Sequence, residues 1–374
     1  MQDLRLSHRF LRHAALALTL VFAGTAMMPV AAEAASRKTD VRKKGSPKKA
    51  PRRNAPAYQG GPKASIYINA ETGEILAESG SAKSIEPASL TKEMTAIVVF
   101  DALKAKKLSL NDTLPLAAAP GPEADGAVTL RRKTGTTPGT LLSVHTLLAA
   151  TAVASAADAT VTLAKAVCGD EDCFTDLMNE KAREILGVRP GERSSTYYVN
   201  SHGMPGNRTT AQDIARIHRY MIETYPQESR YFSLTSYEIN GRTYPGHNAL
   251  LVGYKCKNAL GLPYKCMEAS KTGFFRKAGF GIVGSAAWNG YRVIGVEMGH
   301  PSAAGRNRKM EDGLDRSFQQ LERSHAPKTA SQPWHFPSMG KQPPIEPEPE
   351  PELPENSRLT APVNTAAASP GPRP

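Results

Sequence analysis

The Asn289-Gly290 dipeptide restricts the fold of this 374-residue chain more than any other short feature. Asn-Gly favours the tight type I′ turn that joins two antiparallel strands, and apolar runs flank it on both sides. We therefore expect adjacent antiparallel strands over residues 281–288 and 291–299. Alternating apolar residues around a turn at 71–73 predict a second hairpin, with strands over 64–70 and 74–78.

Helical patterns occupy much of the sequence between and after these hairpins. Apolar residues predict an amphipathic helix from Ser89, a helix over 141–153, and a helix over 159–167 that Asp158 can cap. Three further helices are predicted, one with Phe174, Leu177, Met178 and Ile185, one after a capping box at Thr210-Ala211-Gln212-Asp213, and one with Met310, Leu314, Phe318 and Leu321. Residues 108–140, rich in Gly, Pro and Thr, are expected to form loops and short strands. Two strand pairs with separate helices indicate a mixed α+β fold.

The positive charge of the chain is concentrated in one segment. Residues 36–56 hold nine Lys or Arg and one Asp, so they account for +8 of the total of +12. Residues 1–34 contribute +1 and residues 324–374 contribute −1, which leaves +4 for the remainder. A globular body with this small charge does not have the footprint of a nucleic-acid-binding protein.

The first 59 residues predict export followed by a basic arm. Residues 1–34 read as a signal peptide, with three arginines, an apolar run over 14–30, and small residues before a cleavage site at Ala35. An uncleaved anchor is the alternative. Residues 35–59 are predicted to form a disordered arm, in which 36–56 either contact an anionic surface weakly or act as a solvated linker.

The globular domain is predicted to span residues 60–323, and the remaining tail has a different composition. Residues 324–374 contain 13 prolines and an alternating Glu-Pro run. Such a segment cannot bury a core, so we expect it to be disordered. It has no apolar stripe of the kind that anchors an amphipathic helix to a membrane.

The four cysteines fall into two close pairs in a chain predicted to be exported. Disulfides Cys168–Cys173 and Cys256–Cys266 are the simplest of the three connectivities. Zinc binding is the competing interpretation, but neither spacing matches Cys-x-x-Cys. We therefore expect two local disulfides and no metal site.

Ser89 and Lys92 form a Ser-x-x-Lys motif where a helix is predicted to begin. Residues three apart on a helix share a face, so the lysine lies beside the serine hydroxyl. A lysine whose pKa is lowered can act as the base that makes a serine nucleophilic. The structural alternative is a helix-capping serine followed by a surface lysine. The motif alone does not decide between a catalytic pair and a helix cap.

Four motifs together make this chain resemble the low-molecular-mass penicillin-binding proteins, the D-alanyl-D-alanine carboxypeptidase family of serine peptidases. They are residues 87–95 (PASLTKEMT), 199–204 (VNSHGM), 247–251 (HNALL) and 270–273 (SKTG). The resemblance covers roughly residues 60–323. It implies a β-lactamase/transpeptidase-like fold, with a five-stranded antiparallel sheet flanked by helices, a helical subdomain, and Lys-Thr-Gly on an edge strand.

The resemblance also implies the reaction. Ser89 would attack the penultimate D-alanine carbonyl of a peptidoglycan stem peptide, with Lys92 as base and Ser155 as proton relay. Lys271, Thr272, Gly273, Phe274 and Arg306 would bind the substrate. Lys271 would help to keep Lys92 neutral, backbone N–H groups of Ser89 and Phe274 would form the oxyanion hole, and Arg306 would bind the terminal carboxylate. β-Lactams would acylate Ser89, and no cofactor or metal is implied.

Two positions depart from the family pattern. Ser155-Ala156-Ala157 stands where the family has Ser-x-Asn, and Phe275 stands where a small hydroxyl residue is usual. Both changes remove polar contacts with the substrate.

The sequence is compatible with three functions. They are a periplasmic carboxypeptidase, an endopeptidase that cuts cross-links, and a weakly active or inactive protein that binds peptidoglycan. A β-lactamase is disfavoured because the sequence offers no second acid positioned to activate a deacylating water. The sequence does not indicate an oligomeric state.

Overall fold

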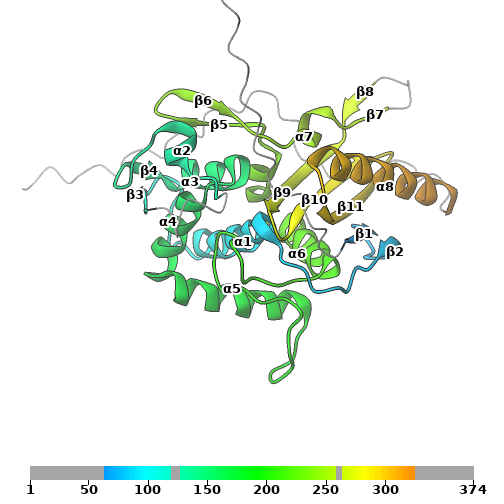
Figure 1. The fold of residues 1–374 in the computed structure, drawn as a ribbon, viewed down its shortest axis with the longest axis horizontal. Coiled ribbons are helices and arrows are strands. Elements are labelled where there is room, and N and C mark those ends of the chain that lie inside the picture. The colour runs from blue at the N-terminus through cyan, green and yellow to red at the C-terminus, as the bar shows by residue number, and fades with distance from the viewer. Residues whose placement is uncertain (1–62, 119–126, 258–262, 325–374) are drawn as a thin grey trace, which may run out of the picture. The chain divides into compact units, whose positions relative to one another are not determined.

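A five-stranded antiparallel sheet organises the computed structural model, which describes residues 63–118, 127–257 and 263–324. Its strands are β1 (Ala64–Asn69), β2 (Ile75–Ser79), β9 (Met267–Phe275), β10 (Gly279–Trp288) and β11 (Tyr291–His300), in the order β2-β1-β11-β10-β9 (Figure 1). Because β9 is an edge strand, the Lys271-Thr272-Gly273 motif lies at one side of the sheet. The predicted α+β fold with a five-stranded sheet is therefore confirmed.

Both predicted hairpins are present. Trp288 pairs with Tyr291, and Asn289 and Gly290 adopt φ of 48° and 80°, as a type I′ turn requires. The first strand of this hairpin, β10, begins two residues earlier than predicted, and the second strand, β11, ends one residue later than predicted. The first hairpin, β1 with β2, closes where predicted, and β1 joins β11 to bring the two hairpins into one sheet.

Helices cover both faces of this sheet (Figure 1). Helix α8 (Ala303–Ser324) packs on one face, where it meets Tyr67, Ile282 and Val293 in one apolar cluster. Helix α6 (Ala211–Thr224) packs on the opposite face against β1 and β11. The strand period of two sends alternate side chains to the two faces, so that Ile294 joins the core on the α6 side.

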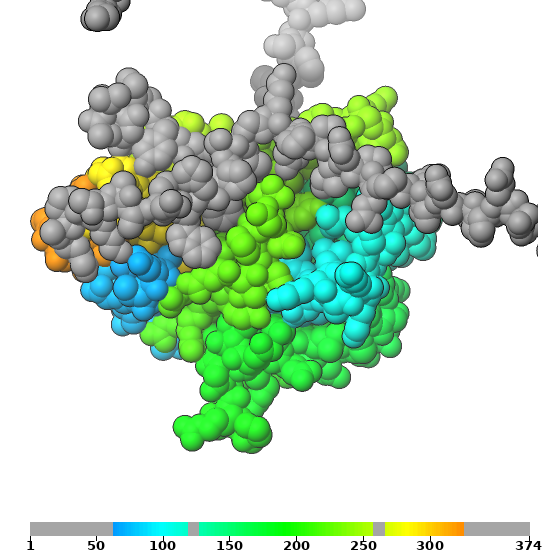
Figure 2. Space-filling view, turned by 180° about the vertical axis from the view of Figure 1, so that it is seen from behind, coloured from blue at the N-terminus to red at the C-terminus, as the bar shows by residue number. Residues whose placement is uncertain are grey.

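The remaining elements lie beside the sheet, most of them in a helical part, with those between residues 250 and 265 next to the edge strand β9 (Figure 1). They are α1 (Thr91–Lys104), β3 (Thr113–Pro115), α2 (Leu130–Thr134), β4 (Leu141–Ser143), α3 (Val144–Ala149), a π-helical turn (Ala150–Ala154), α4 (Ala157–Cys168), α5 (Glu171–Leu186), a 3₁₀ turn (Glu228–Ser233), β5 (Ser236–Ile239), β6 (Arg242–Pro245), α7 (Leu250–Gly253), β7 (Lys255–Lys257) and β8 (Pro263–Lys265). Figure 2 shows green surface from the middle of the chain between the blue N-terminal hairpin and the cyan surface that follows it in sequence.

Three local predictions about these helices are wrong. Helix α1 is not amphipathic, because other elements surround it and bury nearly all of its residues. The apolar run over 141–153 is not one helix, because its first three residues pair with β3 and its last part is π-helical. Asp158 does not cap its helix, which begins at Ala157, and its carboxylate accepts a hydrogen bond from Leu130 N across the fold instead.

The capping box at α6 is confirmed in one half only. Thr210 Oγ1 accepts a hydrogen bond from Asp213 N at 3.1 Å, as an N-cap should. The Asp213 carboxylate does not return to the Thr210 backbone and instead accepts hydrogen bonds from the hydroxyls of Ser195 and Thr196. A tertiary contact therefore replaces the second, local bond of the box.

Glu93 of α1 and His218 of α6 form a fully buried pair between the two helices. The Nδ1–Oε1 distance is 2.9 Å, and both side chains are 0% exposed. Burial removes water from both groups, so each depends on the other for hydrogen bonding.

We predict that His218→Ala lowers the free energy of unfolding by about 3–5 kcal/mol, because it leaves a buried carboxylate without its partner. Urea unfolding measures this value. The double variant Glu93→Met with His218→Leu removes both polar groups and should lose much less. Equal losses in both variants would show that packing, and not the polar pair, sets the stability.

Several predictions concern residues outside the described ranges. They are the signal peptide over 1–34, the basic arm over 35–59 and the Pro-rich tail, which remain predictions. Among the described residues, none of the helices combines the length and the apolar character needed to cross a bilayer.

Candidate active site

Ser89 lies in a single 3₁₀ turn, Ala88–Leu90, that leads directly into α1. Ala88 adopts φ of 50°, a strained conformation for a residue with a side chain. Opposite this turn lies Gly203, where an added Cβ would come within 2.1 Å of the Ala88 carbonyl oxygen. Only glycine allows this approach, so the turn that presents Ser89 is shaped by a segment more than a hundred residues away.

The alternative interpretation of Ser89 as a helix-capping serine is wrong. Leu90 is the N-cap of α1, and no side chain caps the helix there. Instead, Ser89 Oγ lies 3.2 Å from Lys92 Nζ, and both residues line the same cleft. The predicted pairing of serine with lysine is therefore present, although the helical geometry assumed at the serine is not.

Lys92 is buried to 1% exposure and is held by a backbone carbonyl. Its Nζ donates a hydrogen bond to His202 O. Burial places the pKa of Lys92 well below its usual range, and the positive charge of Lys271 lowers this pKa further, while Asp158 opposes the shift. Such an amine can be neutral at moderate pH and can accept a proton.

Lys271 connects the edge strand with the helical part of the molecule. Its Nζ donates to Ser155 Oγ and to the carbonyl oxygen of Thr272, both at 3.0 Å. Burial lowers the pKa of Lys271 to about 7, with Glu93 opposing and Arg306 adding to the shift. Ser155 follows the π-helical turn with φ of 61°, which turns its hydroxyl toward the lysine. Two buried lysines and two serine hydroxyls thus meet at one site.

A cleft of about 360 Å³ contains these groups and the other predicted site residues. Its lining includes Ser89, Lys92, Ser155, Thr272, Gly273, Phe274 and Arg306, and Lys271 reaches Ser155 beneath it. Gly273 allows close packing here, because an added Cβ would lie 3.2 Å from Ser89 N. The backbone of β9 therefore passes directly beside the backbone of Ser89.

Arg306 lies at the start of α8 and is 4% exposed. Its Nη1 donates to the Gly281 carbonyl at 3.0 Å, and its Nε and Nη2 donate to Asn307 Oδ1 at 3.0 and 2.7 Å. These bonds use three of the five N–H groups of a guanidinium. The arrangement fixes the plane of the guanidinium at the cleft.

The two departures from the family pattern both line this cleft. Ala157 is buried, and its backbone N donates to Val128 O at 2.8 Å. Phe275 is also buried and packs with Ala88 and Ala278, beside the turn that carries Ser89. Its neighbour Phe274 is 49% exposed and stacks on Phe280 with a centroid distance of 4.1 Å. At positions 157 and 275, apolar side chains therefore pack where the family pattern has polar ones.

Two histidines of the cleft were not assigned a role from the sequence. His202 supplies the carbonyl that binds Lys92, and His247 is hydrogen-bonded through Nε2 to Thr272 Oγ1 at 2.9 Å. Burial lowers the pKa of each imidazole to about 4, and nearby lysine charge adds to the effect in both cases. Both histidines lie in motifs that supported the family resemblance. Their place in these motifs was the only feature of the sequence that pointed to them as residues of the site.

The two predicted disulfides, Cys168–Cys173 and Cys256–Cys266, are both present. Among the described residues, no group of three His, Cys, Asp or Glu side chains gathers as a metal ion would need.

Comparison with known proteins points to one family. A family model described as D-alanyl-D-alanine carboxypeptidase matches residues 51–302. The D-alanyl-D-alanine carboxypeptidase DacC of Escherichia coli is 31% identical over 240 residues, which cover 63% of this chain and 55% of that protein. DacA of the same organism is 29% identical over 263 residues, covering 69% and 60%. The chain thus spans little more than half the length of these relatives.

Solved structures show the same fold. Penicillin-binding protein D2 from Listeria monocytogenes, in its cefotaxime-bound form, is 27% identical with a TM-score of 0.59, covering 68% of this chain and 96% of that one. Penicillin-binding protein 6B from Escherichia coli is 28% identical with a TM-score of 0.58, covering 71% and 79%. The predicted transpeptidase-like architecture is therefore confirmed.

Proposed function

This chain belongs to the D-alanyl-D-alanine carboxypeptidase family of peptidases, as its motifs predicted, and we propose that it is a serine DD-carboxypeptidase. Its substrates are peptidoglycan stem pentapeptides, from which it removes the terminal D-alanine. The observation that carries the proposal is the 3.2 Å contact between Ser89 Oγ and the buried Lys92 Nζ at the cleft. A serine beside a lysine of lowered pKa is an activated nucleophile.

In the acylation step, Lys92 accepts the Ser89 proton while Ser89 Oγ attacks the penultimate D-alanine carbonyl. The backbone N–H groups of Ser89 and Phe274 donate to the oxyanion, which Gly273 permits by letting β9 pass close to Ser89. Ser155, whose hydroxyl accepts a hydrogen bond from Lys271, gives its proton to the amine of the departing D-alanine and takes in its place the proton that Lys92 removed from Ser89. Water then hydrolyses the ester, releasing the shortened peptide and restoring Ser89. This route requires no cofactor.

β-Lactams should acylate the same serine. The relative from Listeria monocytogenes is described in cefotaxime-bound and ampicillin-bound forms. A penicillin carries a carboxylate and a strained amide, and attack by Ser89 on that amide gives an ester. We therefore propose penicillin binding at this cleft.

We predict that Arg306→Ala lowers peptide hydrolysis much more than labelling by a penicillin ester, which lacks the free carboxylate. A planar guanidinium suits a carboxylate, and the bonds to Gly281 and Asn307 hold it at the cleft. Parallel kinetics with the peptide and the ester measure the two effects. Equal losses would assign Arg306 a role in folding instead.

We predict that Ala157→Asn raises the rate of penicillin acylation roughly tenfold, which corresponds to about 1.4 kcal/mol. Asparagine would return an amide to the buried wall of the cleft, where alanine offers no hydrogen bond. Stopped-flow or quenched labelling gives the rate. An unchanged or lower rate would mean that the cleft has adapted to alanine, and low activity would then not be expected from this residue.

Two other functions have specific support. A D-alanyl-D-alanine endopeptidase of Pseudomonas aeruginosa is 28% identical over 221 residues, covering 58% of this chain and 64% of that protein. This relative favours cleavage of cross-links as a second candidate activity. Ala157 and Phe275 favour a third, a weakly active protein that binds peptidoglycan through its cleft and its basic arm. We also propose a periplasmic location, which rests on the signal-like residues 1–34.

One experiment separates these functions. The purified protein is incubated with an N-acylated pentapeptide and, separately, with a cross-linked muropeptide dimer, and free D-alanine and cleaved monomers are measured. D-alanine from the pentapeptide alone supports the carboxypeptidase. Cleaved dimers support the endopeptidase, and labelling by fluorescent penicillin without turnover of either substrate supports the weakly active protein.

A further inference from the structure

The carboxylate of Glu171 accepts two hydrogen bonds from the segment that faces Lys92 and lies near the ring of a histidine in that segment. Its Oε1 accepts from Ser201 N at 2.9 Å and from Ser201 Oγ at 2.7 Å, and it lies 3.4 Å from His202 Nε2. Glu171 is the first residue of α5, while Ser201 and His202 are buried beside the cleft. One carboxylate oxygen therefore holds Ser201 through two hydrogen bonds and lies close to the ring of the next residue, both from a separate part of the chain.

The backbone of these two residues in turn contacts α1 beside the nucleophile. His202 O accepts the hydrogen bond from Lys92 Nζ, and Ser201 O accepts one from Thr95 Oγ1 at 2.5 Å. A neutral amine has two N–H bonds and one lone pair. When one N–H bond is tied to His202 O, the amine cannot rotate freely, and its lone pair can be directed at Ser89 Oγ 3.2 Å away.

The tautomer of His202 agrees with this arrangement. Met204 N donates to His202 Nδ1 at 3.4 Å, so the proton of the neutral ring lies on Nε2, which faces Glu171. Burial and the nearby Lys92 lower the pKa of His202 to about 4, so the ring is neutral near pH 7. The Nε2–H of His202 therefore lies 3.4 Å from Glu171 Oε1, while the His202 carbonyl binds Lys92.

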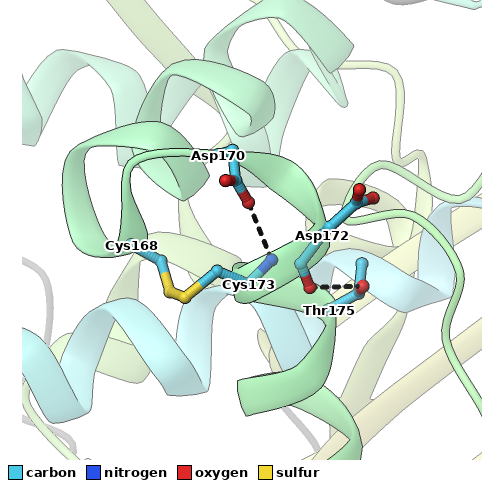
Figure 3. Close-up of a disulfide and its surroundings, with 5 residues drawn as sticks. All are labelled: Cys168, Asp170, Asp172, Cys173 and Thr175. Atoms are coloured by element: carbon cyan, nitrogen blue, oxygen red, sulfur yellow. Dashed lines mark hydrogen bonds between the residues drawn. A yellow bond between two sulfur atoms is a disulfide. The ribbon is translucent and has the colours of Figure 1, made fainter.

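A disulfide encloses the position of Glu171. Cys168 ends α4 and is bonded to Cys173 in the first turn of α5 (Figure 3). Glu171 lies between these two cysteines in the sequence, inside the loop that the disulfide closes. Asp170 Oδ1 accepts from Cys173 N at 2.8 Å, and Thr175 Oγ1 donates to Asp172 O at 3.0 Å (Figure 3). The start of α5 is therefore held by a covalent bond and by two hydrogen bonds.

We propose that Glu171 is a positioning residue for Lys92, acting through Ser201 and His202, and that the Cys168–Cys173 disulfide holds Glu171 in place. The proposal rests on the proposed function in one respect, that Lys92 is the base for acylation. Glu171 does not touch the reacting atoms. It determines where the His202 carbonyl stands and thereby how the Lys92 amine is oriented.

The test compares Glu171→Ala, Glu171→Gln and the matched control Asp172→Ala, which removes a neighbouring charge from the same disulfide loop. Acylation by a fluorescent penicillin is followed over a range of concentrations, after titration of the active fraction. Glu171→Ala should lower the limiting rate constant on the order of tenfold and leave the apparent dissociation constant within about twofold, as expected for a misplaced catalytic group. Glu171→Gln keeps an acceptor oxygen and should stay within about threefold of the wild-type rate.

Asp172→Ala should behave as wild type, and Cys168→Ser with Cys173→Ser should lower the rate without a change in apparent affinity. A merely structural role predicts a lower melting temperature and a smaller active fraction, but an unchanged rate constant per active molecule. That result for Glu171→Ala would overturn the proposal. So would an equal loss for Asp172→Ala, or a loss for Glu171→Gln as large as that for Glu171→Ala.

A second readout separates this proposal from the proposed function. The Lys92 Cε resonance is followed by NMR in protein with ¹³C-labelled lysine, with Lys92→Met to assign it. Glu171→Ala should shift the Lys92 resonance and its titration, whereas Asp172→Ala should not. If the wild-type protein is not acylated, the proposed function fails, and an unmoved Lys92 resonance in Glu171→Ala would overturn the positioning role as well. If the wild-type protein is acylated and Glu171→Ala matches it in rate and in resonance, the positioning role alone fails.

Discussion

A Ser89→Ala variant will form no covalent adduct with a penicillin, whereas the wild-type protein will gain the mass of one. Ser89 has the contact with Lys92 Nζ that can activate a hydroxyl, and it sits where the edge strand passes close to its backbone N. Lys92→Met removes the base but keeps a buried side chain of similar length, so it should slow acylation on the order of 10³-fold, within the range for general base catalysis.

Intact-mass spectrometry and quenched labelling measure these two effects. The control is Lys181→Met, which removes a lysine that pairs with Asp101 and Glu184, none of which lines the cleft. It should label at the wild-type rate. An adduct that persists in Ser89→Ala, or wild-type rates in Lys92→Met, would refute the assignment of nucleophile and base.

The pH dependence of acylation should reveal the electrostatic coupling of the two buried lysines. Lys92 must be neutral to accept a proton, so the rate should rise as pH increases through its pKa, which burial and the charge of Lys271 hold well below the usual range. Lys271→Met removes the positive neighbour while burial remains. The pKa of Lys92 should then increase, and the rising limb of the pH profile should move to higher pH.

The sign of this shift distinguishes coupling from simple damage. Loss of a substrate contact at Lys271 would lower acylation at every pH without moving the limb. The measurement is the second-order acylation constant between about pH 5 and 10, with a penicillin that is stable over that range. A limb that stays in place, or that moves to lower pH, would show that Lys271 does not set the protonation of Lys92.

The parts of this protein that the sequence determined by itself depend on contacts between near neighbours. The Asn289-Gly290 turn, the Thr210 cap and the two disulfides each join residues within ten positions of one another. Ser89 and Lys92 are three residues apart, and their contact also followed from the sequence. Turn geometry and short loop closure restrict such pairs before any tertiary structure forms.

Only the tertiary structure decided the contacts that give these residues their chemistry. Lys271 meets Ser155 across 116 residues, and Lys92 meets His202 across 110. Neither spacing has a local signal, because both pairs are brought together by packing of the edge strand and the helical part against α1. The burial that lowers the pKa of Lys92 arises from the same packing.

The failed local predictions have the same physical cause. Asp158 is a good capping residue by type, but its carboxylate instead accepts a hydrogen bond from the backbone N of Leu130, 28 residues away. Residues 141–153 have an apolar pattern that suits a helix, but pairing with β3 takes the first three of them into a strand. A local preference is worth about 1 kcal/mol or less, and burial against the rest of the fold readily exceeds it.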